Sequence, residues 1–138
     1  MTTARDIMHV GVTCIGEHET LQHAAQQMRD LDVGSLPVCG DDDRLRGIIT
    51  DRDIVTKCIA RGVDPANVIA GDLAQSMPVT IEPQADVTDV LRAMEQHQIH
   101  RLPVMDGQQP VGMISQADLA RHLPETLVGE FIEAVCAS

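Results

Sequence analysis

Two short segments of this sequence pair a hydroxyl residue with an aspartate three positions later. Thr50 precedes Asp53, and Ser115 precedes Asp118. Each pair is predicted to lie where a strand turns into a helix, so the hydroxyl and the free N–H groups of the first turn can meet a phosphate. The aspartate can accept hydrogen bonds from two neighbouring hydroxyl groups of a ligand. The same pattern also fits ordinary helix capping, so both readings stay open.

Cys14 and Cys39 form a second candidate pair. They are expected in the first strand and at the end of the next one, with a helix between them. Such a crossover makes the strands parallel neighbours roughly 4.8 Å apart, within reach of a disulfide. The bond would close a loop of 25 residues (39 − 14) and stabilise the fold by roughly 3 kcal/mol. The alternative is that Cys14 and Cys39 are two buried free thiols. Cys58 and Cys136 lack the CxxC spacing of a metal site and are expected to be structural.

His97 and His122 are candidate zinc ligands. Each lies three positions after an apolar residue of a predicted helix, Met94 and Leu119 respectively. Both are therefore expected on apolar faces that meet at a helix interface. Two histidines do not complete a tetrahedral zinc site, so further ligands would come from a second copy of the chain. The alternative is that each imidazole is hydrogen-bonded to a carboxylate or a carbonyl.

The composition argues against several classes of partner. The 138 residues include 10 basic and 21 acidic ones, and the net charge of −11 repels nucleic acid and anionic lipid. Phe131 is the only aromatic residue, so the core must be aliphatic and stacking platforms for single strands are missing. Neither a spanning apolar run nor a secretory apolar block is present. We expect a cytoplasmic protein without nucleic-acid or membrane partners; the proposed disulfide would fit release without a signal peptide.

The elements that position these residues occur twice. Met94 lies 66 positions after Met28, and residues 102–104 repeat the Leu-Pro-Val of residues 36–38 at the same spacing. Three further pairs recur at a spacing of 65: Gly47 with Gly112, Ile49 with Ile114, and Asp53 with Asp118. Such a duplication predicts two copies of one small fold related by a pseudo-twofold. Each copy of about 60 residues is marginal alone, so the pair should fold together.

Each copy is predicted to run strand, helix, strand, strand, helix. The expected strands are 12–15, 36–39 and 45–50 in the first copy, and 79–81, 102–105 and 111–115 in the second. Thr20 and Asp86 are expected to cap the two long helices. The first of these helices should place five residues on one apolar face: Leu21, Ala24, Ala25, Met28 and Leu31. Short helices should begin at Asp51 and Gln116, and Asp106-Gly107 predicts a hairpin turn.

A module of this order, with a Leu-Pro-Val strand and a Gly-x-x-Ser/Thr-x-x-Asp corner, resembles the CBS domain. The corners read GIITDRD at residues 47–53 and GMISQAD at residues 112–118. The resemblance implies an α+β fold of two tandem CBS modules, at residues 5–65 and 72–123, packed sheet to sheet. It also implies a homodimer formed through helices. The tail at residues 124–138 has apolar residues at helical spacing and is expected to be an extra helix.

CBS pairs commonly hold adenosine derivatives such as AMP, ATP or S-adenosylmethionine between their modules. The resemblance therefore implies that Thr50, Asp53, Ser115 and Asp118 contact ribose and phosphate. Residues 99–104 also resemble a segment of the gamma subunit of AMP-activated kinase, in which a His-Arg pair helps to hold phosphate. The matching residues here are His100 and Arg101. The first copy has Gly34-Ser35 at this place, and a salt bridge to an acidic residue is the alternative role of Arg101.

The leading functional hypothesis is a non-catalytic, stand-alone CBS pair, associated with stress or hypoxia, that senses an adenosyl ligand. The alternative is a rigid stress or interaction protein, stabilised by a disulfide and by zinc, that does not bind nucleotide. An enzyme is not expected, because no Ser/His/Asp order, P-loop or HExxH motif occurs.

Overall fold

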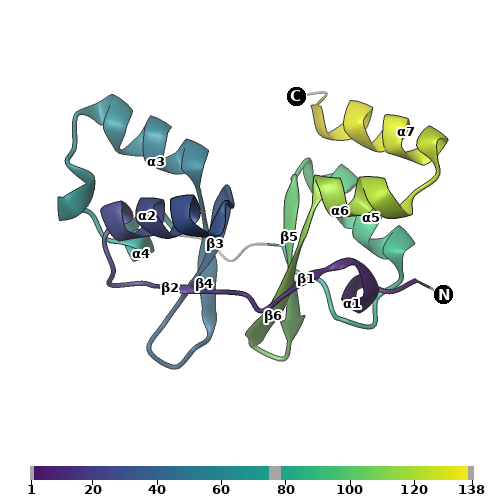
Figure 1. Cartoon of the computed structure of the whole chain (residues 1–138), viewed down its shortest axis with the longest axis horizontal. Helices are drawn as coiled ribbons and strands as arrows, with labels where there is room; N and C mark the ends of the chain where they lie inside the picture. Colours follow the sequence, from purple (N-terminus) through teal and green to yellow (C-terminus); the bar gives the residue numbers. More distant parts are fainter. Residues whose placement is uncertain (1, 75–78, 137–138) are drawn as a thin grey trace. The chain divides into compact units, whose positions relative to one another are not determined.

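The computed structural model describes residues 2–74 and 79–136 of the chain, which divide into two compact units (Figure 1). The continuous unit consists of residues 13–74. The split unit combines residues 2–12 with residues 79–136. Each unit contains one three-stranded sheet and one aliphatic core. The predicted α+β class and the two tandem modules are therefore confirmed.

The continuous unit contains the first three sequence-predicted strand regions. Its elements in order are β2 (Ile15–Gly16), α2 (Leu21–Leu31), β3 (Ser35–Cys39), β4 (Leu45–Thr50), α3 (Asp51–Lys57), the 3-10 turns η1 (Ile59–Arg61) and η2 (Pro65–Asn67), and α4 (Ala70–Leu73). The sheet order is β2-β3-β4. Strand β2 runs parallel to β3, with Ile15 opposite Val38, and β4 runs antiparallel to β3. The predicted helix start at Asp51 is confirmed.

The split unit repeats this plan around a second sheet. Its elements in order are α1 (Ala4–Ile7), β1 (His9–Val10), α5 (Val87–His97), β5 (Arg101–Asp106), β6 (Gln109–Ser115), α6 (Gln116–His122) and α7 (Glu125–Cys136). The sheet order is β1-β6-β5 and both pairings are antiparallel. Gly107, with φ of 63°, makes the predicted tight turn between β5 and β6. Helix α7 confirms the predicted helical tail, and α6 begins at Gln116 as expected.

Both long helices begin at the predicted caps. The side chain of Thr20 accepts a hydrogen bond from His23 N at 3.1 Å, and Asp86 accepts one from Thr88 N at 2.9 Å. The Thr88 hydrogen bond also holds the pKa of Asp86 below its ordinary value. Apolar residues spaced three and four apart bury one stripe of each helix: Leu21, Ala24 and Met28 in α2, and Val90, Leu91 and Met94 in α5.

Two expectations for the long helix of the first copy are wrong. Ala25 and Leu31 are exposed, Leu31 by 47%, instead of lying on the buried face. Ala25 lies just beyond the edge of the buried stripe, about 40° around the helix from Leu21. Leu31 is the last residue of α2, after which Asp32 takes a left-handed conformation with φ of 55°. The helix therefore leaves the core within its last turn, after Met28.

The first strand of each copy is shorter than predicted. Of the expected strand at residues 12–15, only Ile15 lies in β2, which continues to Gly16, and Cys14 lies just before it. In the second copy the expected strand is reduced to one parallel bridge between Ile81 and Val104. The Gly16 N–H donates to the Glu19 carboxylate at 2.7 Å, which turns the chain away from the sheet. Pro83 follows Ile81 by two positions and has no N–H to extend the second pairing.

The first residues of the chain complete the sheet and core of the second copy. Ala4 N donates to Ala85 O at 2.8 Å, and Val87 N donates to Thr2 O at 3.0 Å. Strand β1 then pairs along β6, with His9 opposite Met113. These contacts place residues 2–12 in the split unit rather than beside the rest of the first copy.

The equivalent residues of the second copy complete the continuous unit in the same register. Ala70 N donates to Glu19 O at 2.7 Å, and Leu21 N donates to Val68 O at 2.9 Å. Each of these four residues lies 66 positions from its counterpart in the split unit, as Ala70 does from Ala4. The two copies have therefore exchanged their leading segments, a connection that the repeat pattern alone did not predict.

The exchange explains the first glycine of each corner motif. A Cβ placed on Gly47 would lie 2.8 Å from the Cβ of Ala74, and one placed on Gly112 would lie 2.9 Å from His9 O. Both distances are too short for a stable contact, so the exchanged segment can cross its strand only where the strand has no side chain. Gly47 and Gly112 are thus required for packing, whether or not the other residues of the corner motifs bind a ligand.

The cores are aliphatic, as the composition predicts. The buried side chains of the split unit include Leu102, Ile114 and Leu119, and those of the continuous unit include Ile15, Leu21 and Ile49. The side chain of Phe131 lies outside the described part of the chain. Within residues 2–74 and 79–136, none of the helices has the length and apolar character needed to cross a membrane.

Candidate functional site

The two hydroxyl–aspartate pairs form reciprocal capping boxes at equivalent strand-to-helix corners. Between β4 and α3, Asp53 N donates to Thr50 Oγ1 at 3.0 Å, and Thr50 N donates to Asp53 Oδ2 at 3.1 Å. Between β6 and α6, Ser115 N donates to Asp118 Oδ2 at 2.8 Å. The capping reading of these four residues is thus confirmed, and ligand contact stays a prediction.

The two aspartates differ in exposure and in partners. The Asp118 side chain is only 2% exposed, and its Oδ1 lies 2.9 Å from His9 Nε2 and 3.1 Å from Arg121 Nη1. The Asp53 side chain is 23% exposed, and its Oδ1 lies 3.2 Å from Lys57 Nζ. Equivalent motif positions therefore hold one enclosed carboxylate and one that solvent still reaches.

Three predicted ligand residues line one open pocket of the split unit, with a volume of about 520 Å³. The lining residues are His100, Arg101, Ser115, Gln116, Ala117 and Ala120. The pocket lies where β5 begins and α6 follows β6, so Arg101 of β5 and Gln116 of the first turn of α6 line the same pocket. Thr50 and Asp53 lie in the continuous unit, and Asp118 is not a lining residue but accepts hydrogen bonds from Ser115, which is one.

Arg101 is the cationic residue of this pocket. Within residues 2–74 and 79–136, the guanidinium of Arg101 takes part in none of the ion pairs, so the predicted alternative of a salt bridge is not found there. In a chain with a net charge of −11, a half-buried arginine that forms no ion pair among the described residues provides a local positive charge that can attract an anion.

Gln116 is a pocket residue that the sequence reasoning missed. Its Oε1 lies 2.9 Å from His100 Nδ1, which joins the two sides of the pocket and orients the imidazole. Its position directly after Ser115 in the corner motif could have indicated that it lines the pocket. The first copy has Asp51 at the equivalent position and Gly34-Ser35 in place of His100-Arg101. The two copies therefore differ in charge where an anion would bind.

The two candidate zinc ligands lie at helix ends. His97 ends α5 and His122 ends α6, and both side chains are exposed. The expectation that they lie on buried apolar faces is wrong, because both helices leave the core in their last turn, as α2 does at Leu31. His122 Nδ1 is 2.9 Å from Asp118 O. No set of three or more metal-binding side chains gathers anywhere in the described ranges 2–74 and 79–136.

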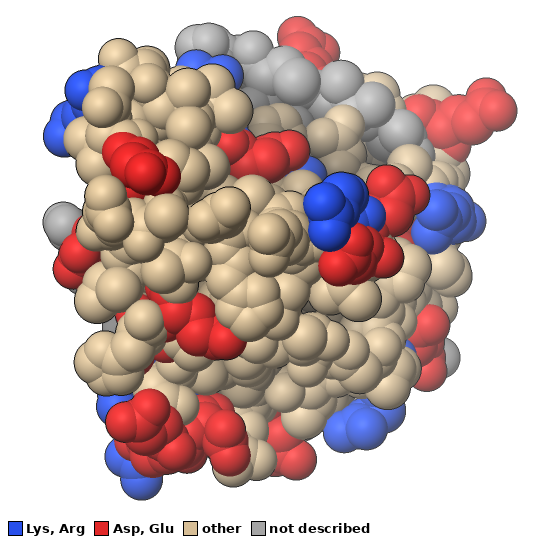
Figure 2. Space-filling view, turned by 60° about the vertical axis from the view of Figure 1, so that its left-hand side comes forward, with Lys and Arg blue, Asp and Glu red and all other residues tan. Residues whose placement is uncertain are grey.

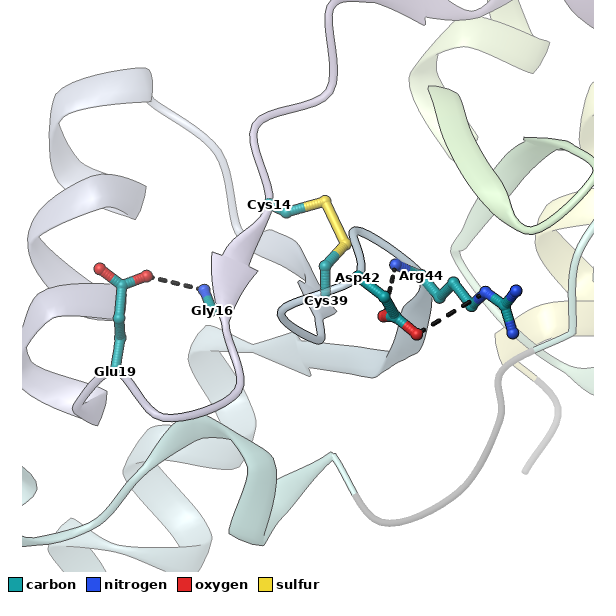
Figure 3. The surroundings of a disulfide bond; sticks show 6 residues. All are labelled: Cys14, Gly16, Glu19, Cys39, Asp42 and Arg44. Carbon is teal, nitrogen blue, oxygen red and sulfur yellow. Dashed lines mark hydrogen bonds and ion pairs between the residues drawn. A yellow bond between two sulfur atoms is a disulfide. The ribbon is translucent and has the colours of Figure 1, made fainter.

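The Cys14–Cys39 disulfide is present, with Cα atoms 5.8 Å apart (Figure 3). It joins the residue before β2 to the last residue of β3, and these strands are the parallel neighbours that the crossover predicts.

Beside the disulfide, the turn between β3 and β4 is held by Asp42, which accepts a hydrogen bond from Arg44 N at 3.1 Å. This hydrogen bond lowers the pKa of Asp42. Cys58 is a buried free thiol, which fits the structural role expected of it, and the side chain of Cys136 lies outside the described residues.

Comparison with known proteins gives matches over almost the whole chain. The CBS domain family model matches residues 4–59 and 70–125. Hypoxic response protein 1 of Mycobacterium tuberculosis is 53% identical over 137 residues, which is 99% of this chain and 96% of that protein.

Solved structures agree with this result. The crystal structure of Hypoxic Response Protein I with two coordinated zinc ions has a TM-score of 0.81 and 54% identity, over 89% of this chain and 100% of that one. A crystal structure of CBSX2 in complex with AMP has a TM-score of 0.73 and 22% identity, over 87% of this chain and 94% of that one. The second match is a likeness of fold alone.

Proposed function

The chain belongs to the CBS-domain family, and we propose that it is a non-catalytic regulatory CBS pair that senses an adenosyl ligand such as AMP, ATP or S-adenosylmethionine. In this proposal the phosphate of a nucleotide binds in the pocket of the split unit. The observation that carries it is the arrangement of His100, Arg101 and Ser115 around one open pocket, with an arginine that forms no ion pair among the described residues.

The chemistry of the pocket supports an anionic ligand. The guanidinium of Arg101 can donate two parallel hydrogen bonds to a phosphate, and the imidazole of His100 is already oriented by Gln116. S-adenosylmethionine has no phosphate and carries a positive sulfonium group, so AMP or ATP fits this pocket better. An adenosyl ligand is the class that the CBS resemblance implies, and the 53% identity to hypoxic response protein 1 supports a role in stress.

Substituting Arg101 is expected to weaken nucleotide binding. Arg101→Ala removes the pocket's guanidinium, so the Kd for AMP should rise about tenfold, as loss of a charge-assisted hydrogen bond to phosphate predicts. Isothermal titration calorimetry of the intact protein with AMP, ATP and S-adenosylmethionine measures this. Arg29→Ala is the matched control, because Arg29 lies on α2 of the continuous unit and pairs with Asp30. Absence of a binding signal with all three compounds would contradict the proposal.

A second candidate function has support of its own. It is a rigid stress or interaction protein held by the disulfide and by zinc, and the Cys14–Cys39 bond together with the zinc ions of Hypoxic Response Protein I favours it. We propose His97 and His122 as its zinc ligands. His122 uses Nδ1 toward Asp118 O, which leaves Nε2 for a metal. A complete site would need ligands from a second copy of the chain.

The same proposal includes a homodimer. Five aliphatic side chains of the continuous unit, on α2, α3 and the segments that follow them, are more than two-fifths exposed: Leu31, Val33, Val55, Ile59 and Val63. Figure 2 shows acidic side chains spread over the face it presents, with a broad uncharged area between them. Exposed aliphatic side chains of this number favour association with a second subunit.

Zinc and the dimer can be tested in one experiment. Native mass spectrometry is expected to show a zinc-bound dimer of the wild-type protein, and His97→Ala should lose zinc because removing one of the two histidines leaves too few ligands for a tetrahedral zinc site. His18→Ala is the matched control, since His18 is an exposed histidine that lies beside Glu17 in the continuous unit. A monomer without zinc, or a zinc content that His97→Ala leaves unchanged, would contradict this part of the proposal.

A further inference from the structure

His9 contacts the carboxylate of Asp118, the residue that the CBS resemblance implies would bind the ribose of a ligand. Strand β1 pairs with β6, and this pairing brings His9 from the start of the chain to Asp118 at the start of α6. The Nε2 atom of His9 lies 2.9 Å from Oδ1 of Asp118. The contact therefore exists because of the exchanged leading segment, which the corner motif does not contain.

Both oxygens of Asp118 are already engaged. Oδ2 accepts hydrogen bonds from Ser115 N at 2.8 Å and from Ser115 Oγ at 2.9 Å. Oδ1 faces His9 Nε2 at 2.9 Å and Arg121 Nη1 at 3.1 Å. With the side chain only 2% exposed, a ligand hydroxyl can reach Oδ1 only if one of these two groups moves away.

We infer that His9 competes with the hydroxyl groups of an adenosyl ligand for Asp118 and thereby sets the affinity of the pocket in the split unit. This inference rests on the proposed function. His9 suits the role because its side chain is 70% exposed and stands on a strand of two residues, so it can turn into solvent without disturbing the core. Arg121 is 64% exposed and can stay on the edge of the carboxylate.

The inference also links the pocket to the start of the chain. When a ligand takes Oδ1, the segment of residues 2–12 loses a side-chain contact with α6, while the backbone pairing of β1 with β6 remains. Binding and release of His9 are then coupled, and the coupling acts equally in both directions. Asp53, the equivalent carboxylate in the continuous unit, has Lys57 as its charged partner among the described residues, so this coupling belongs to the split unit alone.

Calorimetric titration of the intact protein with AMP tests the inference. His9→Ala is expected to lower the Kd for AMP about tenfold, because the ligand no longer has to replace a hydrogen bond to a charged group. His18→Ala, which removes an exposed imidazole beside Glu17, should leave the Kd unchanged. A thermal melt of each variant verifies that the fold is intact. If the wild type binds AMP and His9→Ala binds with the same Kd, the inference is wrong while the proposed function stands.

A second readout separates the remaining outcomes. In the wild type, adding AMP should shift the imidazole NMR signals of His9 and leave those of His18 in place. Binding by His9→Ala when the wild type shows none would support both the inference and the proposed function. If neither the wild type nor His9→Ala binds AMP, both the proposed function and the inference about His9 are wrong.

Discussion

Opening the Cys14–Cys39 disulfide is expected to lower the free energy of unfolding by roughly 3 kcal/mol, because the bond closes a loop of 25 residues. The bond restricts the unfolded chain. It also ties β2 to β3 where their pairing covers only Ile15 and Gly16. A parallel pair this short has few ladder hydrogen bonds of its own, so the covalent link contributes much of what holds it.

Chemical denaturation with and without reductant measures this effect. The double variant Cys14→Ser/Cys39→Ser should be less stable than the oxidised wild type and should no longer respond to reductant. The buried thiol of Cys58 is present in both proteins, so a change that comes from Cys58 would appear in both. Equal stability of the oxidised and reduced wild type would contradict a stabilising role for the disulfide.

A thermal melt of the intact protein separates the two proposed functions. A protein that senses AMP should melt at a higher temperature when AMP is added, and the shift should grow with the logarithm of the ratio of AMP concentration to Kd. A rigid disulfide- and zinc-stabilised protein should respond to reductant and chelator and not to nucleotide. Response to all three would show that one chain combines both properties.

Asp118→Ala is expected to cost roughly 2 to 3 kcal/mol of stability, and Asp53→Ala about 1 kcal/mol. Both changes remove the aspartate of a capping box. Asp118 is enclosed and also anchors His9, whereas Asp53 is 23% exposed and its further charged partner is Lys57. The larger cost at Asp118 therefore comes from its burial and from the loss of its contact with the exchanged segment.

Denaturation of the two variants side by side is the measurement, since each is the other's control for loss of the helix cap. Hydrogen exchange at the amides of residues 2–12 adds a local readout, and Asp118→Ala should accelerate it while Asp53→Ala should not. Equal losses of stability with unchanged exchange would show that His9 contributes nothing to holding the leading segment.

Much of this protein could be predicted from the order of residues along the chain. The caps at Thr20, Thr50 and Ser115 were predictable because each involves residues no more than three positions apart. The Cys14–Cys39 pair followed from one local crossover, in which a strand, a helix and the next strand bring their ends together. The repeat at 66 positions and its CBS resemblance supplied the two modules.

Long-range contacts determined the rest. The exchange of leading segments joins His9 to Asp118, which lie more than 100 positions apart, and no periodicity in the sequence indicates that pairing. The same contact encloses one corner carboxylate, while its equivalent, Asp53, stays accessible. The pocket position of Gln116 and the exposure of His97 could not be predicted for the same reason, because both depend on where a helix meets the core. Local patterns thus predict hydrogen bonds within a turn, and packing between distant segments determines which of those groups a ligand can reach.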